Sequence, residues 1–185
     1  MMRTLLGILV LGALGGFWLT QQTPGNEYTT KNRLLHFLTV DSKINLYLSD
    51  LDSSLTESDI KERFANLALD CGSEASDLGD RSCYAPIQAV NDIDAWFAVF
   101  FFQDQELSGV KIDLPPSGHA PMSSALHQRH GEPRGVKVSR DQETTNQWYL
   151  RNGAVVMNRD VADEALSMVY WASVESVVRK RMSER

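Results

Sequence analysis

The chain lacks the short motifs that would specify a reaction. Its 185 residues contain no Cys-x-x-Cys pair, no His-Glu-x-x-His motif and no Gly-x-Ser-x-Gly turn. Such motifs hold metal ions or nucleophilic side chains, so the usual sequence signs of a metalloprotease, a thiol oxidoreductase and a serine hydrolase are missing. A glycine-rich phosphate loop is missing too, because Gly15-Gly16 lies inside an apolar run. We therefore predict a protein that is not an enzyme and uses no cofactor.

An excess of basic residues is also absent. The chain has 18 basic and 24 acidic residues, which gives a net charge of −6. Phosphate backbones repel an acidic domain, so nucleic acid is not an expected partner. Hydrophobic residues make up 43% and charged residues 23%, the balance of an ordinary globular domain. At this length, one domain with a sizeable core is the expectation.

The one long apolar run lies at the N-terminus. A single charge, Arg3, precedes a run from Leu5 to Leu19 that contains no polar residue. This is the pattern of a secretory signal, and the four glycines inside the run disfavour a soluble helix. We predict export of the chain. The large side chains of the membrane segment are Leu5, Leu6, Ile8, Leu9, Val10, Leu11, Leu14, Phe17, Trp18 and Leu19.

Cleavage and retention of this segment both remain open. No Ala-x-Ala site follows the run, while a spanning helix needs about 20 apolar residues. No cysteine follows it either, which excludes a lipid anchor there. We interpret residues 1–20 as a signal peptide or membrane anchor, 21–33 as a tether and 34–185 as a soluble domain. The domain is expected in the periplasm of a bacterial cell envelope, anchored to the inner membrane or released.

The only two cysteines, Cys71 and Cys83, flank a loop-like polar stretch. In an oxidising compartment such a pair forms a disulfide, and closing a loop of this size stabilises by roughly 3 kcal/mol. A metal or redox site is the alternative, but further ligands are not apparent. We predict the disulfide.

Patterns in the first half predict a helix and several strands. Ile44, Leu46 and Leu48 alternate as in a strand. A helix capped by Ser54 or Thr56 is expected to end near Cys71-Gly72. It would place Ile60, Phe64, Leu67 and Ala68 on one face. An aromatic-rich strand at 95–102, a turn at 103–106 and a strand at 107–114 follow, and Pro115-Pro116 ends the last strand.

The second half repeats this order. A helix at 121–130 stops at Gly131 and Pro133, and Asn152-Gly153 between two apolar runs predicts a hairpin. A strand at 165–172 and a helical tail at 173–185 follow. The fold class is therefore α+β: an antiparallel sheet with helices packed on one face. Two helix-then-strands units stand in tandem, at about 55–114 and 121–172, after an N-terminal hydrophobic helix.

Three motifs of the second half carry a resemblance to known families. They are Ser123-x-x-Leu126-x-x-Arg129-His130-Gly131-Glu132-Pro133, Trp148-x-Leu150-x-Asn152-Gly153-x-Val155 and Val169-Tyr170-Trp171. This segment resembles the helix-plus-meander domains of the SmpA/OmlA outer-membrane-assembly lipoproteins and of the β-lactamase-inhibitor-protein fold. Gly131, Pro133, Trp148 and Gly153 match their outline. The resemblance implies a binding or scaffolding module without catalytic residues.

Two histidines are weak candidates for a metal site. His127 and His130 lie three residues apart on the predicted helix, with His119 or Glu132 as a third ligand. This spacing is common by chance, so we expect a surface helix and no metal.

These observations favour a non-enzymatic envelope protein that interacts with another protein through its sheet face or its loops. An apolar-ligand binding module, with the aromatic strand lining the pocket, is the first alternative. A small hydrolase or metal-dependent enzyme using His127 and His130 is the second. The expected partners are the membrane, through the N-terminal segment, and an unidentified protein.

Overall fold

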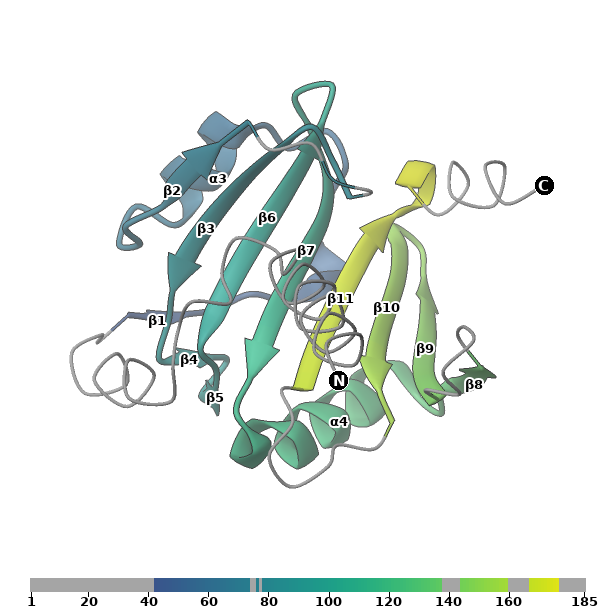
Figure 1. Ribbon diagram of the computed structural model, residues 1–185. Helices are drawn as coiled ribbons and strands as arrows, with labels where there is room; N and C mark the ends of the chain where they lie inside the picture. The colour runs from purple at the N-terminus through teal and green to yellow at the C-terminus, as the bar shows by residue number, and fades with distance from the viewer. Residues whose placement is uncertain (1–41, 74–75, 77, 138–143, 160–166, 177–185) are drawn as a thin grey trace, which may run out of the picture. The chain divides into compact units, whose positions relative to one another are not determined.

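The computed structural model describes residues 42–73, 76, 78–137, 144–159 and 167–176 (Figure 1). The predicted membrane segment, Leu5–Leu19, and the tether lie outside these residues. The helical tail is described only to residue 176, and residues 174–176 are helical. Within the described part of the chain, none of the helices has the length and apolar character needed to span a membrane.

A large antiparallel sheet forms the centre of the described domain. Its eight strands are ordered β2-β3-β6-β7-β11-β10-β9-β8, and every neighbouring pair runs antiparallel. Their bounds are Asp70–Gly72 (β2), Arg81–Pro86 (β3), Phe97–Gln103 (β6), Glu106–Leu114 (β7), Arg134–Lys137 (β8), Thr144–Leu150 (β9), Gly153–Asn158 (β10) and Ser167–Ser173 (β11). A smaller sheet has the order β1-β4-β5, from Lys43–Ile44, Ala89–Val90 and Ile93–Asp94.

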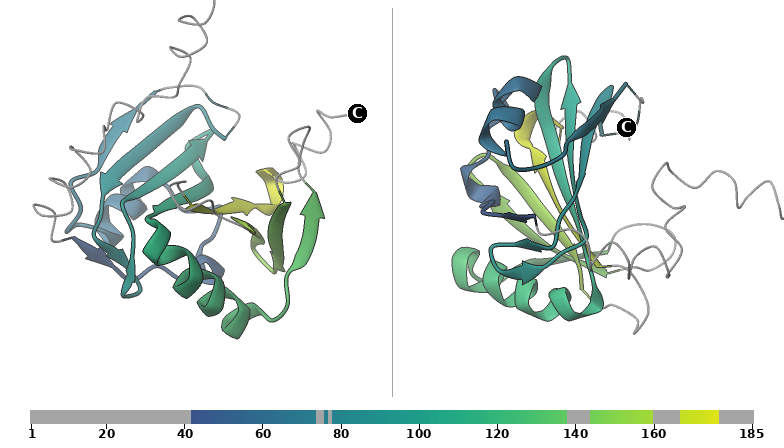
Figure 2. Two further views of the ribbon diagram at one scale, coloured as in Figure 1. Left: turned by 60° about the horizontal axis from the view of Figure 1, so that its bottom comes forward. Right: turned by 90° about the vertical axis from the view of Figure 1, so that its left-hand side faces the viewer.

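The chain builds the large sheet from two units of the same order. Helix α3 (Glu57–Arg63) precedes β2, β3, β6 and β7, and helix α4 (Pro116–His130) precedes β8, β9, β10 and β11. The last strands of the two units, β7 and β11, pair at the centre of the sheet. Both helices lie on the same face (Figure 2). The predicted α+β class is therefore confirmed, and the element order agrees with two helix-then-strands units.

The core lies between this face of the sheet and the two helices. Phe100, Val110 and Trp171 of the central strands are fully buried. From the helical side, Ile60 and Phe64 pack at α3, where the Phe64 ring centroid lies 5.4 Å from that of Phe100. The strand alternation that the sequence predicted therefore directs one set of side chains toward the helices.

Helix α3 is shorter than predicted. Thr56 caps it in a reciprocal capping box with Asp59, as expected, but the helix ends at Arg63. Cys71 and Gly72 belong to strand β2, where Cys71 pairs with Cys83. The prediction of a helical end at Gly72 was wrong because the cross-strand cysteine pair requires extended backbone there. Leu67 is buried as predicted, but Ala68 is exposed.

Helix α4 begins earlier than predicted, at Pro116 instead of residue 121. Proline fits the first turn of a helix because its fixed φ is suited and its missing N–H has no partner there anyway. Pro115-Pro116 therefore both ends the strand and starts the helix, and Pro121 lies inside the helix. Gly131, with φ of 76°, ends it as predicted.

The predicted strand at 44–48 is only partly formed. Ile44, Leu46 and Leu48 are buried and alternate with exposed residues, but ladder pairing stops at Ile44. Leu48 begins a short 3-10 helix, η1 (Leu48–Asp50). Strands β3, β4, β5 and β8 were not anticipated. The predicted hairpins at 103–106 and around Asn152-Gly153 are present.

Candidate functional site

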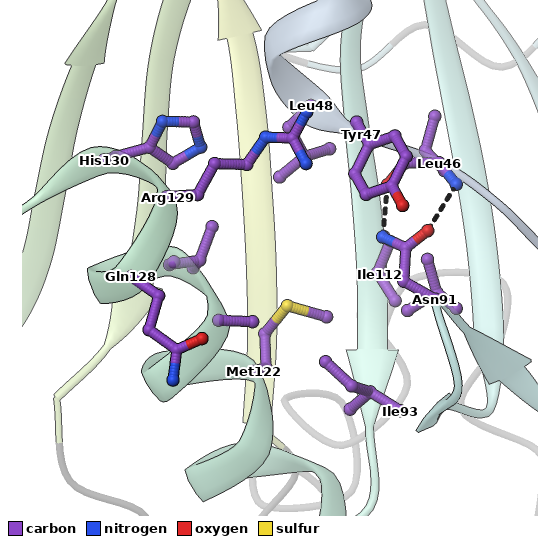
Figure 3. Close-up of a pocket in the computed structure, with 13 residues that line it drawn as sticks. Leu46, Tyr47, Leu48, Asn91, Ile93, Ile112, Met122, Gln128, Arg129 and His130 are labelled. Atoms are coloured by element: carbon purple, nitrogen blue, oxygen red, sulfur yellow. Dashed lines mark hydrogen bonds between the residues drawn. The ribbon is translucent and has the colours of Figure 1, made fainter.

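A groove, here called the α4 groove, lies between helix α4, the segment Leu46–Leu48 and the β4–β5 hairpin (Figure 3). Its volume is about 300 Å³. Most of its wall is apolar, and Ile112 of β7 contributes from the sheet. The lining residues are Leu46, Tyr47, Leu48, Val90, Asn91, Ile93, Ile112, Met122, Ala125, Leu126, Gln128, Arg129 and His130.

Asn91 fixes the wall opposite α4. It follows β4 in a tight turn, with φ of 50°, a left-handed conformation that asparagine tolerates better than most residues. Its Oδ1 accepts a hydrogen bond from the Leu46 backbone N–H at 2.9 Å, and its Nδ2 donates one to the Leu46 carbonyl at 2.7 Å. One amide side chain therefore replaces the strand partner that Leu46 lacks.

Asn152 holds the far end of the same segment. Its Nδ2 donates to the carbonyl oxygens of Leu48, at 3.0 Å, and Leu51, at 2.6 Å. The hairpin residue that the sequence predicted therefore also ties η1 to the second unit. The two asparagines together hold the Leu46–Leu48 wall against the rest of the fold.

Polar side chains from the last turn of α4 line one part of the groove. The Arg129 guanidinium carbon lies 4.0 Å from the Tyr47 ring centroid, and its Nη2 lies 3.8 Å from Asp50 Oδ1. Burial, and to a lesser extent the neighbouring Arg129 charge, lower the pKa of His130, which favours the uncharged form of this ring. Arg129 is therefore the single permanent charge among the lining residues.

The histidine candidates do not converge on one point. His127 Nδ1 lies 3.1 Å from the Ser123 carbonyl oxygen, to which it donates when it carries the proton, and Nε2 lies 3.3 Å from Glu132 Oε2. Its ring packs edge-on against Trp148. His130, by contrast, lines the α4 groove. Glu132 is thus brought to His127, but no third ligand joins them among the residues whose placement is described.

His119 forms a contact that sequence reasoning did not anticipate. Its Nδ1 lies 2.7 Å from Ser167 Oγ, 48 residues away. Ser167 is 0% exposed, so a substrate has no access to its hydroxyl. The pair joins α4 to the start of β11. No local pattern indicates it, because the two residues meet only through the sheet order.

The predicted disulfide between Cys71 and Cys83 is confirmed. Glu57 is the third member of the one three-residue group of potential metal ligands in the described ranges. The bonded sulfurs are not thiolates, so this group is no metal centre. The Glu57 carboxylate instead accepts hydrogen bonds from Arg81 and Lys61, which lower its pKa to about 2.

The second face of the sheet also carries aromatic side chains. Tyr84 and Phe97 pack with ring centroids 5.2 Å apart. Tyr149 is 49% exposed and Met168 43% exposed, and Arg134 lies over the Tyr149 ring. Aromatics therefore occur on both sides of β6, where Phe100 and Phe102 face the helices.

Comparison with known proteins does not identify a family for this chain. No family model matches the chain, and no curated protein matches it significantly. The solved structure of an extracellular protein containing an SCP domain, from Bacillus anthracis str. Ames, is similar with a TM-score of 0.42 and 11% identity. The match covers 75% of this chain and 50% of that one, so this chain spans about half the length of its counterpart. A likeness at this level assigns neither function nor location.

Proposed function

We propose that the chain is an exported, non-enzymatic interaction module that binds an apolar segment of a protein partner in the α4 groove. The observation that carries the proposal is the groove itself. It is apolar along most of its wall and has a few polar groups from one helical turn. Concave apolar sites with a small number of placed polar groups are typical of binding sites.

The chemistry of the lining supports binding over reaction. Its thirteen residues include no carboxylate, serine, threonine or cysteine. General acid–base or nucleophilic catalysis most often uses such groups together with histidine, held within hydrogen-bond reach of each other. His130 is the one lining side chain suited to proton transfer near pH 7, and the groove offers it no carboxylate to orient it.

Export is supported by two independent features. The apolar N-terminal run has the character of a secretory signal. The Cys71–Cys83 disulfide is a bond that persists in oxidising compartments. We place the domain in the cell envelope, anchored in the inner membrane or released to the periplasm.

Filling the groove tests the proposal. Ala125 lines the groove and is exposed, so Ala125→Trp should occlude it without disturbing the core. Ala65 is also exposed but lies beyond the end of α3, so Ala65→Trp is the matched control. Cross-linked envelope fractions should yield the same partner with wild type and Ala65→Trp, and lose it with Ala125→Trp. Equal recovery by all three proteins would contradict the proposal.

A second function, binding of a small apolar ligand, is favoured by the groove's volume. About 300 Å³ is the lower end of the range for small-molecule sites. Native mass spectrometry of protein purified from its own envelope decides between the two. A bound small molecule that Ala125→Trp removes would support ligand binding.

A further inference from the structure

We infer that the α4 groove recognises the C-terminal residue of a partner polypeptide: its apolar side chain enters the groove and its carboxylate pairs with Arg129. This inference rests on the proposed function and names the chemistry of the partner.

The charge of the lining points to an anion. Arg129 is the one permanent cation among the lining residues, and none of them is acidic. The Asn91 amide already bonds the Leu46 backbone through both its oxygen and its nitrogen, and it is uncharged. A guanidinium presents a planar fork of donors that matches a carboxylate in two parallel hydrogen bonds.

The guanidinium is held in place but keeps its donors. Figure 3 shows Arg129 extending from α4 toward Tyr47 across the groove. Packing on the Tyr47 face, at 4.0 Å, orients the group without using its N–H donors. Its nearest acid, Asp50, lies 3.8 Å away, beyond hydrogen-bond distance, and both side chains are about half exposed. Within the described residues the Arg129 side chain makes no hydrogen bond and its one ion pair is the long contact with Asp50, so a carboxylate gains hydrogen bonds without displacing any.

The size of the groove distinguishes a chain terminus from a long acyl chain. A volume of about 300 Å³ holds one or two aliphatic side chains and their carboxylate. Met122 and Ile112 supply apolar contacts for such side chains. Arg129 is the one arginine or lysine in the lining, and a single guanidinium suits a monoanion better than a doubly charged phosphate.

Two synthetic probes test the inference: N-acetyl-Ala-Leu-Leu as the free acid and as the C-terminal amide. They are titrated into the disulfide-bonded protein, and binding is measured by calorimetry and by methyl chemical shifts of Ile93, Ile112 and Met122. We expect the acid to bind at least about tenfold more tightly than the amide. A tenfold ratio corresponds to about 1.4 kcal/mol, close to the lower end of the contribution of a hydrogen bond to a charged group. This advantage should fall as salt is added.

Two arginine variants separate the charge from the fold. Arg129→Gln should lower the affinity for the acid to that for the amide. Arg134→Gln removes another guanidinium that lies over a tyrosine ring, at 5.5 Å from Tyr149, and should leave both affinities unchanged. Both side chains are exposed, so neither variant should compromise folding.

Each other outcome counts against the inference in a distinct way. Equal binding of acid and amide, abolished by Ala125→Trp, would overturn carboxylate recognition and leave the proposed function standing. Tighter groove binding of decanoate than of the peptide acid would assign the site to fatty acids. No binding of either peptide at millimolar concentration would also overturn the inference, and the proposed function is then judged by the Ala125→Trp recovery experiment alone.

Discussion

A single asparagine replaces a strand at the wall of the α4 groove. Asn91 offers one acceptor and one donor in the geometry of a peptide group, and both are used by Leu46, 45 residues earlier in the chain. Its positive φ places the side chain for this contact. Backbone conformation and hydrogen bonding therefore depend on the same residue, so its replacements separate the two contributions.

We expect Asn91→Ala to lower the free energy of unfolding by about 3 kcal/mol. Two hydrogen bonds at about 1 kcal/mol each and about 1 kcal/mol of left-handed strain make up this figure. Asn91→Gly removes the hydrogen bonds without the strain and should cost roughly 1 kcal/mol less. Urea denaturation of both variants measures the difference. Equal stability of wild type and Asn91→Gly would show that the side-chain bonds contribute nothing.

Glu57 predicts an acid-sensitive contribution to stability. Hydrogen bonds from Arg81 and Lys61 lower its pKa from 4.5 to about 2. The folded pKa is depressed, so the stabilisation is present above pH 4.5 and is lost as the pH falls toward 2. Because the Lys61 and Arg81 side chains are 49% and 37% exposed, solvent screens both pairs, and about 1 kcal/mol is the expected size.

Denaturation between pH 2 and pH 6 measures this contribution in Glu57→Gln. The variant should lose stability at pH 6 and approach wild type at pH 2. Glu62→Gln, on an exposed position of the same helix, is the control and should follow the wild-type curve. If the free energy of unfolding of Glu57→Gln depended on pH as that of wild type does, Glu57 would not be the source of the acid-sensitive stability.

The residues of the α4 groove were beyond prediction from the sequence. The disulfide and the Asn152-Gly153 hairpin follow from local signals, and both are present. The groove joins residues 46–48, 90–93 and 122–130, and only the tertiary fold brings these segments together. Arg129 and His130 were singled out as a helix motif and a metal candidate, but no local pattern links them to Tyr47.

At the scale of elements, the sequence predicted strands better than helix ends. The aromatic strand and its partner appear as β6 and β7, because apolar alternation directly reflects a half-buried sheet. The predicted helix at 121–130 is shorter than α4, because a proline pair indicates the end of a strand as readily as the start of a helix. Strands β4, β5 and β8 are two to four residues long and carry too little pattern to detect.

Helix α4 approaches the smaller sheet through Gly118. A Cβ at this position would lie 2.4 Å from the Asp94 backbone oxygen, so the helix or the β5 strand would have to move. In an exposed helix, alanine is favoured over glycine by about 1 kcal/mol. Here we expect the reverse: Gly118→Ala should destabilise by roughly 1–3 kcal/mol.

Thermal or urea unfolding of Gly118→Ala checks this sign. Gly72→Ala is a suitable comparison, because a Cβ there meets nothing within 4 Å. It should leave the free energy of unfolding within about 0.5 kcal/mol of wild type. A more stable Gly118→Ala protein would mean that α4 and β5 adjust freely to each other.

At the scale of the whole described domain, two units of the same order share one core. Their strands meet only at β7–β11, but that seam runs from Leu114 opposite Ser167 to Gly109 opposite Ala172. Val110 and Trp171 face each other across it, and both are fully buried. Neither unit can bury its last strand alone, so the repeated order of helix and strands describes two halves of one sheet and not two separate domains.

This shared seam predicts that both units unfold in one transition. Trp171→Phe shrinks a side chain at the seam and should lower stability by about 2 kcal/mol. Native-state hydrogen exchange should then show the same loss at the Phe100 amide, in the first unit, and at the Val155 amide, in the second. A loss confined to Val155 would show that β8–β11 opens independently. Asn91 and Asn152 attach the Leu46–Leu48 wall to both units. Equal losses would therefore mean that destabilising either unit also destabilises this wall of the α4 groove.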